Sequence, residues 1–181
     1  MSETARYRSI TRKYCLRADG EPGCGVDLAS GGDPCCTWAW QVELPHEQYM
    51  YYNSNCPVRG PIQLRADAFA HRASEPESLD WVYSSHLIED RPRDQWPAIF
   101  AFWATMLKPG GHLILLVPER TRWEAALRRG QSPNCSHAGP EPAVGDMSIA
   151  AIAAGLEIVE ERLTNLDEND YTILGVFRRP Q

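Results

Sequence analysis

Carboxylates stand at the ends of two strand-like runs in this sequence. The run 38–44 carries Glu43 near its end, and the run 61–66 is followed directly by Asp67. An ionised carboxylate accepts hydrogen bonds from hydroxyl, amino and ammonium groups, and the bonds are strongest when the donor is charged. We therefore expect Glu43 and Asp67 to contribute to a polar ligand site.

A loop of small residues follows a third strand-like run. The run 25–29 contains Asp27 and continues into Ser30-Gly31-Gly32-Asp33-Pro34. Glycine has no Cβ and adopts positive φ readily, so a ligand can approach the backbone closely at such a loop. The pattern predicts a strand that ends in a tight, open loop.

Further strands and helices must position these residues. A fourth strand is predicted at 79–83, just before Ser84-Ser85-His86. Asp94 is expected to cap a helix with Pro97 in its first turn, and Lys108-Pro109-Gly110-Gly111 is expected to end that helix. Helical spacing predicts one buried stripe, which comprises Trp96, Ile99, Phe100, Trp103 and Leu107.

The second half of the chain continues this alternation. The unbroken apolar run 112–118 is typical of a strand covered on both faces. Thr121 and Glu124 have the spacing of a capping box, which predicts a short helix, and Ser148 is expected to cap another. Two closing strands are expected to form an antiparallel hairpin, at 156–164 and 170–178.

Strands separated by helical crossovers predict an α/β fold with a mostly parallel sheet and helices on both faces. Residues 1–22 begin with basic and apolar residues interleaved, which favours an amphipathic lead-in packed on the domain over a free tail. Parallel sheets of this kind bind ligands outside the carboxyl ends of their strands. We therefore expect the strand-end carboxylates and the glycine loop to share one edge.

Composition excludes several classes of function. The chain has 181 residues, which suits one domain, and its net charge of −6 disfavours nucleic acid as a partner. No apolar run is long enough to span a bilayer and no signal peptide is recognisable, so a cytoplasmic location is expected. The six cysteines are expected to be reduced, and Cys24, Cys35 and Cys36 lack the paired Cys-x-x-Cys spacing of a zinc site, so no metal is predicted.

Four blocks, taken together, resemble a known family. They are Val26 to Pro34, Asp67-Ala68, Ser78 to Asp90, which contains Ser-x-His-Leu-x-Glu, and Leu107 to Pro118, which begins Leu-Lys-Pro-Gly-Gly. Their order and spacing resemble the class I S-adenosylmethionine-dependent methyltransferases with a Rossmann-like fold, in a short variant of the ubiquinone and menaquinone methyltransferase group. The last two blocks are the most specific part of this resemblance.

The resemblance implies a role for each residue at the predicted edge. Asp27 and the following loop (Ala29, Ser30, Gly31, Gly32) would receive the methionine part of S-adenosylmethionine, and Glu43 would hold the ribose hydroxyls. Asp67 would face the adenine amino group, with Ala68 beside it. The end of the fourth strand (Ser84, Ser85, His86) would lie between cofactor and acceptor.

His86 is the candidate general base, since imidazole titrates near neutral pH; the alternative is that it only orients its loop. Glu119, Asn134 and His137 are candidates for contact with the acceptor, with structural loop contacts as the alternative. No Asn/Asp-Pro-Pro-Tyr/Phe block for gripping a flipped base is present, so the acceptor is expected to be a small molecule or a glycan.

The resemblance also implies a division of the one domain. The lead-in occupies 1–22, the cofactor-binding core 23–118 and the C-terminal part 119–181, with an acceptor-side loop at 131–145. Two features depart from the family pattern: only the middle glycine of its glycine loop is kept, and Pro34 to Thr37 is too short for the usual helix. They motivate the alternative of a catalytically silent Rossmann-like binding or assembly module. Association into a homo-oligomer is left open.

Overall fold

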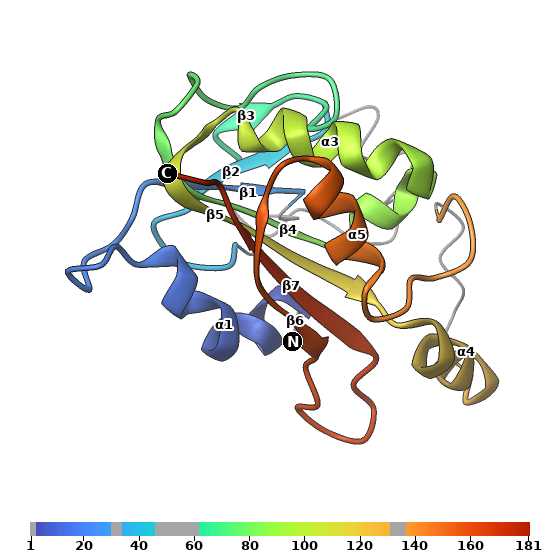
Figure 1. Cartoon of the computed structure of the whole chain (residues 1–181). Helices are drawn as coiled ribbons and strands as arrows, with labels where there is room; N and C mark the ends of the chain where they lie inside the picture. The colour runs from blue at the N-terminus through green and yellow to red at the C-terminus, as the bar shows by residue number, and fades with distance from the viewer. Residues whose placement is uncertain (1–2, 30–33, 46–61, 131–136) are drawn as a thin grey trace.

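The computed structural model describes residues 3–29, 34–45, 62–130 and 137–181 (Figure 1). Its strands join one seven-stranded sheet in the order β3-β2-β1-β4-β5-β7-β6. The strands are β1 (Gly25–Leu28), β2 (Trp40–Glu43), β3 (Leu64–Arg65), β4 (Leu79–Ser85), β5 (Leu107–Pro118), β6 (Glu157–Leu163) and β7 (Thr172–Arg178). β1 to β5 pair in parallel, whereas β7 is antiparallel to both β5 and β6. The predicted mostly parallel sheet and antiparallel closing hairpin are confirmed.

Helices cover both faces of this sheet. They are α1 (Glu3–Thr11), α3 (Trp96–Ala104), α4 (Arg120–Arg128) and α5 (Asp146–Ala153), with short 3-10 turns η1 (Arg12–Cys15), η2 (Ile88–Asp90) and η3 (Arg93–Gln95). α3 and α5 lie together on one side of the sheet and α1 on the other (Figure 1). No helix in the described part of the chain is both long and apolar enough to cross a bilayer.

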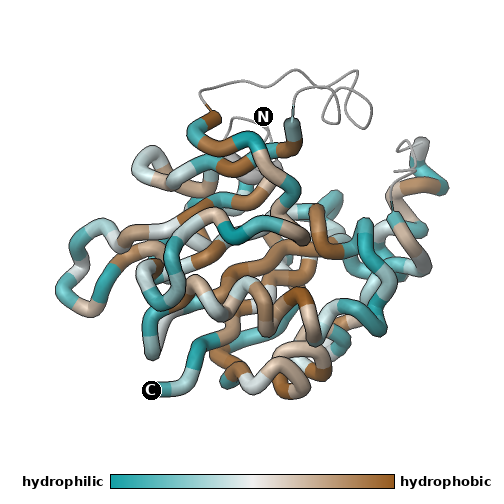
Figure 2. Tube along the Cα trace, turned by 90° about the horizontal axis from the view of Figure 1, so that it is seen from above, coloured by the Kyte–Doolittle hydropathy of each residue, from teal (hydrophilic) through white to brown (hydrophobic). Residues whose placement is uncertain are grey.

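The side chains of β5 are apolar on both faces of the sheet, so both faces must be covered. Leu113, Leu115 and Val117 belong to the core under α3 and α5, whereas Ile114 and Leu116 belong to the core under the N-terminal segment. All five are essentially inaccessible to solvent, as predicted from the unbroken apolar run. Seen from above, the apolar residues concentrate along these central strands and the polar ones on the surrounding turns (Figure 2).

Helix starts are where the sequence predictions were wrong. α3 begins two residues after Asp94, which lies in η3, and no side chain caps it. α4 is capped by Glu119, whose carboxylate accepts from the Arg122 amide, so the Thr121–Glu124 capping box does not form. α5 follows Gly145 at φ 104°, and Ser148 lies inside its first turn instead of capping it.

The end of the central helix also differs from prediction. α3 stops at Ala104, before the Lys108-Pro109-Gly110-Gly111 sequence, which is part of β5. Leu107 is buried as expected, but as the first residue of that strand. The carbonyls of Thr105 and Met106 bind the amides that lead into β4, so pairing with the sheet takes over before the glycines are reached.

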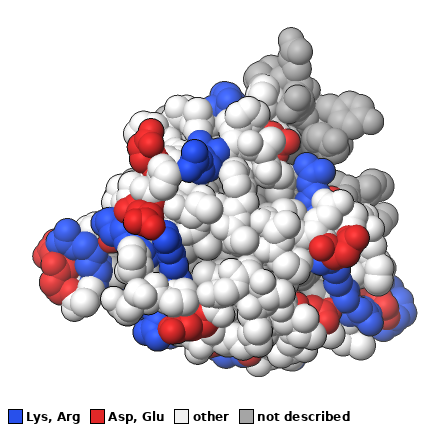
Figure 3. All heavy atoms as spheres, turned by 45° about the horizontal axis from the view of Figure 1, so that its top comes forward, with Lys and Arg blue, Asp and Glu red and all other residues white. Residues whose placement is uncertain are grey.

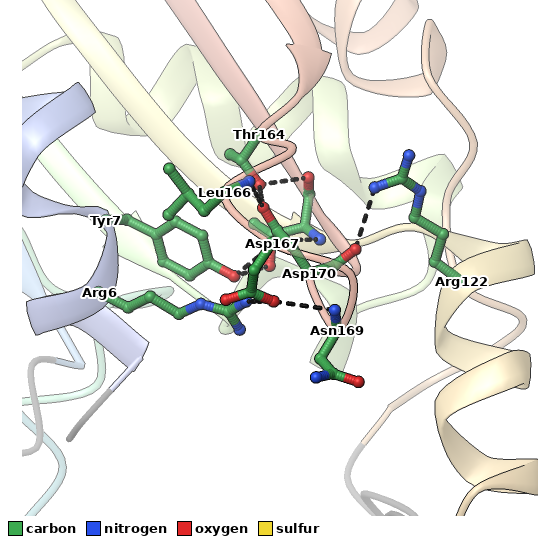
Figure 4. A network of polar contacts seen from close by, with 9 residues as sticks. Arg6, Tyr7, Arg122, Thr164, Leu166, Asp167, Asn169 and Asp170 are labelled. Atoms are coloured by element: carbon green, nitrogen blue, oxygen red, sulfur yellow. Dashed lines mark hydrogen bonds and ion pairs between the residues drawn. The ribbon is translucent and has the colours of Figure 1, made fainter.

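The N-terminal lead-in is packed on the sheet, as predicted. Hydrogen bonds to Asp170 hold it there (Figure 4). Tyr7 of α1 is fully buried and donates its hydroxyl to Asp170 Oδ1 at 3.0 Å. The other carboxylate oxygen accepts from the Thr164 hydroxyl at 2.5 Å and the Leu166 amide at 2.7 Å. Burial works to raise the pKa of Asp170, but these hydrogen bonds outweigh it and hold the pKa below its usual value.

We expect Asp170→Asn to lower the free energy of unfolding by about 1–3 kcal/mol at neutral pH, because an amide nitrogen cannot accept two of these bonds. A carboxylate whose pKa is depressed by folding contributes its full stability at a pH above its unfolded pKa. It loses this stability as the pH falls through its folded pKa. The difference between wild type and variant, measured by urea unfolding, should therefore shrink in acid.

Asp167→Asn is the matched control in the same turn. Its ion pair with Arg6, 2.6 Å long, involves side chains that are partly exposed, and such pairs contribute about 1 kcal/mol or less. An Asp170→Asn variant as stable as wild type, or a difference that persists unchanged in acid, would contradict the role given to Asp170.

Candidate functional site

The residues predicted at the strand ends do share one edge of the sheet. β3, β2, β1 and β4 are neighbours and run in parallel, so their carboxyl ends lie side by side. Asp27 is the third residue of β1, and Glu43 is the last residue of β2. Ser84 and Ser85 end β4, and Ser84 is paired in register with Leu28 of β1. The expected polar edge is thus present.

Asp27 carries a carboxyl group into the interior. The residue is 1% exposed, and its Oδ2 accepts a 2.6 Å hydrogen bond from the Cys35 amide. Burial raises the pKa of Asp27 well above its usual value, and the hydrogen bond only partly offsets this. A cationic group placed beside Asp27 would therefore stabilise its charged form.

Glu43 is also buried at this edge, at 4% exposure. Its Oε1 accepts from the amide of the next residue, Leu44, at 2.9 Å. The backbone of Glu43 is held in the sheet, because its carbonyl accepts from Ala66 just after β3. The side chain is therefore placed by β2 and by the bond to the residue that follows it.

Asp67 is more exposed and opens a turn after β3. Its Oδ1 accepts from the Phe69 amide at 2.9 Å, and its Oδ2 lies 3.9 Å from the Arg91 guanidinium. The carbonyl of the adjacent Ala68 accepts from Trp103 Nε1 of α3 at 2.8 Å. These bonds fix Asp67 and Ala68 relative to the helix layer.

The turn out of β1 begins at Ala29. Its φ of 60° lies in the left-handed region that favours glycine, and its amide donates to the Val42 carbonyl of β2. Ser30, Gly31 and Gly32 lie outside the described residues. Among residues 34–39, which are described, no helix separates the loop from β2, in agreement with the short connection read from the sequence.

Ser84 brings an orphaned polar group to the edge. The residue is 2% exposed, and its hydroxyl has no hydrogen-bond partner in the described part of the chain. A buried hydroxyl without a partner is destabilising, and a bound polar ligand is one way to satisfy it. The orphaned hydroxyl therefore marks the end of β4 as a place for a ligand.

His86 follows β4 in a left-handed backbone conformation, at φ 51°. Its amide is bonded to Leu116 of β5, and its Nδ1 lies 3.3 Å from Glu89 Oε1. Glu89 is buried, which raises its pKa even though the contact with His86 acts in the opposite direction. The sequence motif contained Glu89, but no role was predicted for it.

His137 joins the same group from a distant part of the chain. Its Nε2 lies 3.8 Å from Glu89 Oε1, and its Nδ1 lies 2.5 Å from Glu141 Oε1. Burial lowers the pKa of His137, but the contact with Glu141 and the negative charge of Glu89 and Glu141 outweigh it, so the pKa is raised. We call His86, Glu89, His137 and Glu141 the histidine–glutamate cluster.

Two aromatic rings border the histidine–glutamate cluster. Tyr171 lies edge-on to His86, with ring centres 6.1 Å apart, and Trp123 of α4 lies 5.9 Å from His137. Neither ring was predicted, because they come from α4 and the closing hairpin and only the fold brings them here. The cluster thus has an apolar border as well as buried charge.

The other two predicted acceptor residues fare differently. Glu119 is buried, and its carboxylate caps α4 and binds the Thr121 hydroxyl, so the structure gives it a structural task. Asn134 lies outside the described residues. His137 is therefore the one acceptor candidate that the described structure brings next to His86.

Glu141→Gln should lower the pKa of His137, because it removes the nearest negative charge. A histidine whose pKa is raised by folding contributes stability below its unfolded value of about 6.5 and loses it as the pH rises through the folded pKa. The variant should therefore be destabilised more in mildly acidic buffer than in alkaline buffer. An NMR titration of the His137 ring protons, with the exposed Glu124→Gln as control, measures the shift, and an unchanged titration would contradict the cluster.

Comparison with solved structures finds the same fold in methyltransferases. An S-adenosylmethionine-dependent methyltransferase from Mesorhizobium loti is 18% identical with a TM-score of 0.60, covering 87% of this chain and 91% of that chain. One from Methanosarcina mazei is 12% identical with a TM-score of 0.61, covering 94% and 97%. The N-methyltransferase NodS from Bradyrhizobium japonicum, in complex with S-adenosylhomocysteine, is 15% identical with a TM-score of 0.61, covering 98% and 87%.

No family model and no curated protein sequence matches this chain. At identities this low, the likeness to the solved structures concerns the arrangement of helices and strands. The chain therefore has the fold of the class I S-adenosylmethionine-dependent methyltransferases.

Proposed function

We propose that the protein is an S-adenosylmethionine-dependent methyltransferase that acts on an oxygen or nitrogen of a small-molecule or saccharide acceptor. The observation that carries the proposal is the edge formed by β2, β1 and β4, where two buried acidic side chains and an unpartnered buried hydroxyl stand on neighbouring strands. A purely structural edge would not need a buried acid such as Asp27, whose charged form is disfavoured by burial.

The residues present fit this cofactor. Asp27 would hold its ammonium group, Glu43 its ribose hydroxyls, and Asp67 with Ala68 its adenine. The loop after β1 (Ala29, Ser30, Gly31, Gly32) would follow the methionine part, and Ser84 and Ser85 would supply hydroxyls. When bound, S-adenosylmethionine supplies a methyl group on a positively charged sulfur, so no metal is needed for the transfer that we propose.

The histidine–glutamate cluster would serve the acceptor side. Glu89 faces His86 Nδ1, which orients the ring and assigns proton uptake to Nε2. The proton leaves the acceptor's O–H or N–H group for His86 as the acceptor atom gains the methyl group. His137 and Asn134 are proposed to contact the acceptor, whereas the Glu119 carboxylate is used by the cap of α4.

The surface supports a small acceptor over a nucleic acid. On the face shown in Figure 3, acidic and basic side chains are interspersed, with no extended basic field. The net charge of −6 acts in the same direction. We further propose a cytoplasmic enzyme of the ubiquinone and menaquinone methyltransferase group, built as the single domain 1–181.

A catalytically silent binding module is the second candidate. Asp27 and Glu43 each already accept a backbone hydrogen bond, and Ala29 stands at a left-handed position where glycine is favoured. In such a module the acidic side chains would serve local structure, and Asp27 or Glu43 could be replaced without loss of a ligand.

Calorimetric titration with S-adenosylmethionine and S-adenosylhomocysteine separates the two candidates. Wild type should bind both. Asp27→Asn should weaken binding by about thirtyfold or more, since losing one partner of a buried charged pair costs about 2–5 kcal/mol. Glu43→Gln should weaken it by about tenfold or more, since a hydrogen bond to a charged group contributes about 1.5–3 kcal/mol. Glu124→Ala, on the exposed face of α4, is the matched control. No binding by wild type at millimolar ligand would favour the silent module and contradict the enzyme.

Methyl transfer tests the role of His86. In a screen of phenols, amines and saccharides with labelled cofactor, His86→Gln should lower kcat by about 10²–10⁴-fold, the usual contribution of a general base. The affinity for S-adenosylhomocysteine should stay at the wild-type value. A variant with the full rate would assign His86 to orienting its loop only.

A further inference from the structure

Three buried thiols meet on the face of the sheet that the N-terminal segment covers. They belong to Cys15, the last residue of η1, and to Cys35 and Cys36, between β1 and β2. Their sulfur atoms all lie within 4.8 Å of one another, and the residues are 0%, 1% and 4% exposed. We call these residues the thiol cluster.

The backbone around the thiol cluster is tightly held. The Cys15 carbonyl accepts from the Gly23 amide at 2.9 Å, and the Cys15 thiol lies 3.9 Å from the Thr11 carbonyl. On the other side, the Cys35 amide is bound to Asp27. The cluster therefore joins two segments, far apart in sequence, whose positions are fixed independently.

The spacing of the sulfur atoms suits a metal ion. Zinc binds thiolates at about 2.3 Å in tetrahedral geometry, which sets neighbouring sulfur atoms roughly 3.8 Å apart. The observed separations, all at or below 4.8 Å, need only a small contraction to reach this value. Sulfur ligands select soft ions such as Zn²⁺, Cd²⁺ and Cu⁺ over Mg²⁺ or Ca²⁺.

We propose that Cys15, Cys35 and Cys36 form a three-thiolate site for a soft metal ion of the Zn²⁺ type. The thiols lose their protons to solvent as the sulfur–metal bonds form. Among the described residues no fourth cysteine, histidine or acidic residue joins the group, so an exchangeable ligand such as water completes the coordination. Metal would tie the lead-in to the segment that follows the loop after β1.

This site was not predicted from the sequence. The cysteines considered there were Cys24, Cys35 and Cys36, but Cys24 is exposed and is not a member of the group. Cys15 takes its place because η1 folds back against the segment between β1 and β2. None of the three proposed ligands is assigned to the cofactor. The Asp27 carboxylate, which is assigned to it, is bonded to Cys35, so the metal titration is carried out without cofactor.

Cadmium is a suitable probe, because its thiolate complexes absorb in the ultraviolet. Titration of the reduced full-length protein should give a charge-transfer band that saturates at one ion per chain, and equilibrium dialysis should give the same stoichiometry. Cys15→Ala and Cys36→Ala should each lower the affinity by at least about tenfold, the loss seen when even a residue supporting a metal ligand is removed. Zinc should raise the melting temperature of wild type but not of Cys15→Ala.

Cys24→Ala and the double variant C56A/C135A are the matched controls, because together they remove every cysteine outside the thiol cluster. Both should keep the band and its stoichiometry. Comparison of the metal-free melting temperatures shows whether each variant is folded. Absence of a cadmium band in wild type, a full band in Cys15→Ala, or loss of the band in a control variant would overturn the proposal.

Discussion

Two-sided burial of the central strands is the constraint on which the rest of this structure depends. β4 and β5 are apolar on both faces, so neither can form part of a stable sheet until helices or chain segments cover each side. α3, the crossover between β4 and β5, covers one side together with α5, and the N-terminal lead-in with the connection between β1 and β2 covers the other. The parallel arrangement in turn brings the carboxyl ends of β3, β2, β1 and β4 to a single edge.

Several polar groups at that edge are buried, although a protein interior is an unfavourable place for polar groups without partners. The carboxyl of Asp27 is held away from water at the end of β1, and the Ser84 hydroxyl has no partner in the described part of the chain. The histidine–glutamate cluster, beyond β4, also contains a buried acid, because Glu89 lies between two imidazoles. Buried groups of this kind lower stability unless a ligand or a partner charge compensates them, and this links the fold to the function that we propose.

Much of the fold could be predicted because apolar periodicity and turn residues are local signals. The runs at 25–29 and 79–83 became β1 and β4, and the unbroken run 112–118 lies inside β5. Helix caps were predicted less well. Asp94, Thr121 and Ser148 have the right residue types, but tertiary contacts decide where a helix begins, as the Glu119 cap of α4 shows.

Apart from His137, the residues of the candidate site were predictable where a strand end places them directly. Asp27, Glu43 and Ser84 could be predicted because they lie at the ends of predicted strands. Glu141, Tyr171 and Trp123 could not, because they come from the chain before α5, the closing hairpin and α4, respectively, and only the fold brings them to the histidine–glutamate cluster. The thiol cluster shows the same limit, since nothing in the spacing of Cys15 and Cys35 predicts that their sulfur atoms meet. Such convergence is a property of the packed chain and leaves no local pattern.

We propose that the carboxyl edge of β3, β2, β1 and β4 binds the cofactor. Backbone amide NMR shifts of the labelled protein, recorded with increasing S-adenosylhomocysteine, test it most directly. The largest shifts should map to Asp27 to Ala29, Glu43, Asp67 to Phe69 and Ser84 to His86, while amides at the opposite edge, such as Leu79 and Asp80, should stay unchanged. Saturable shifts that lie away from this edge, or none at millimolar ligand, would contradict it.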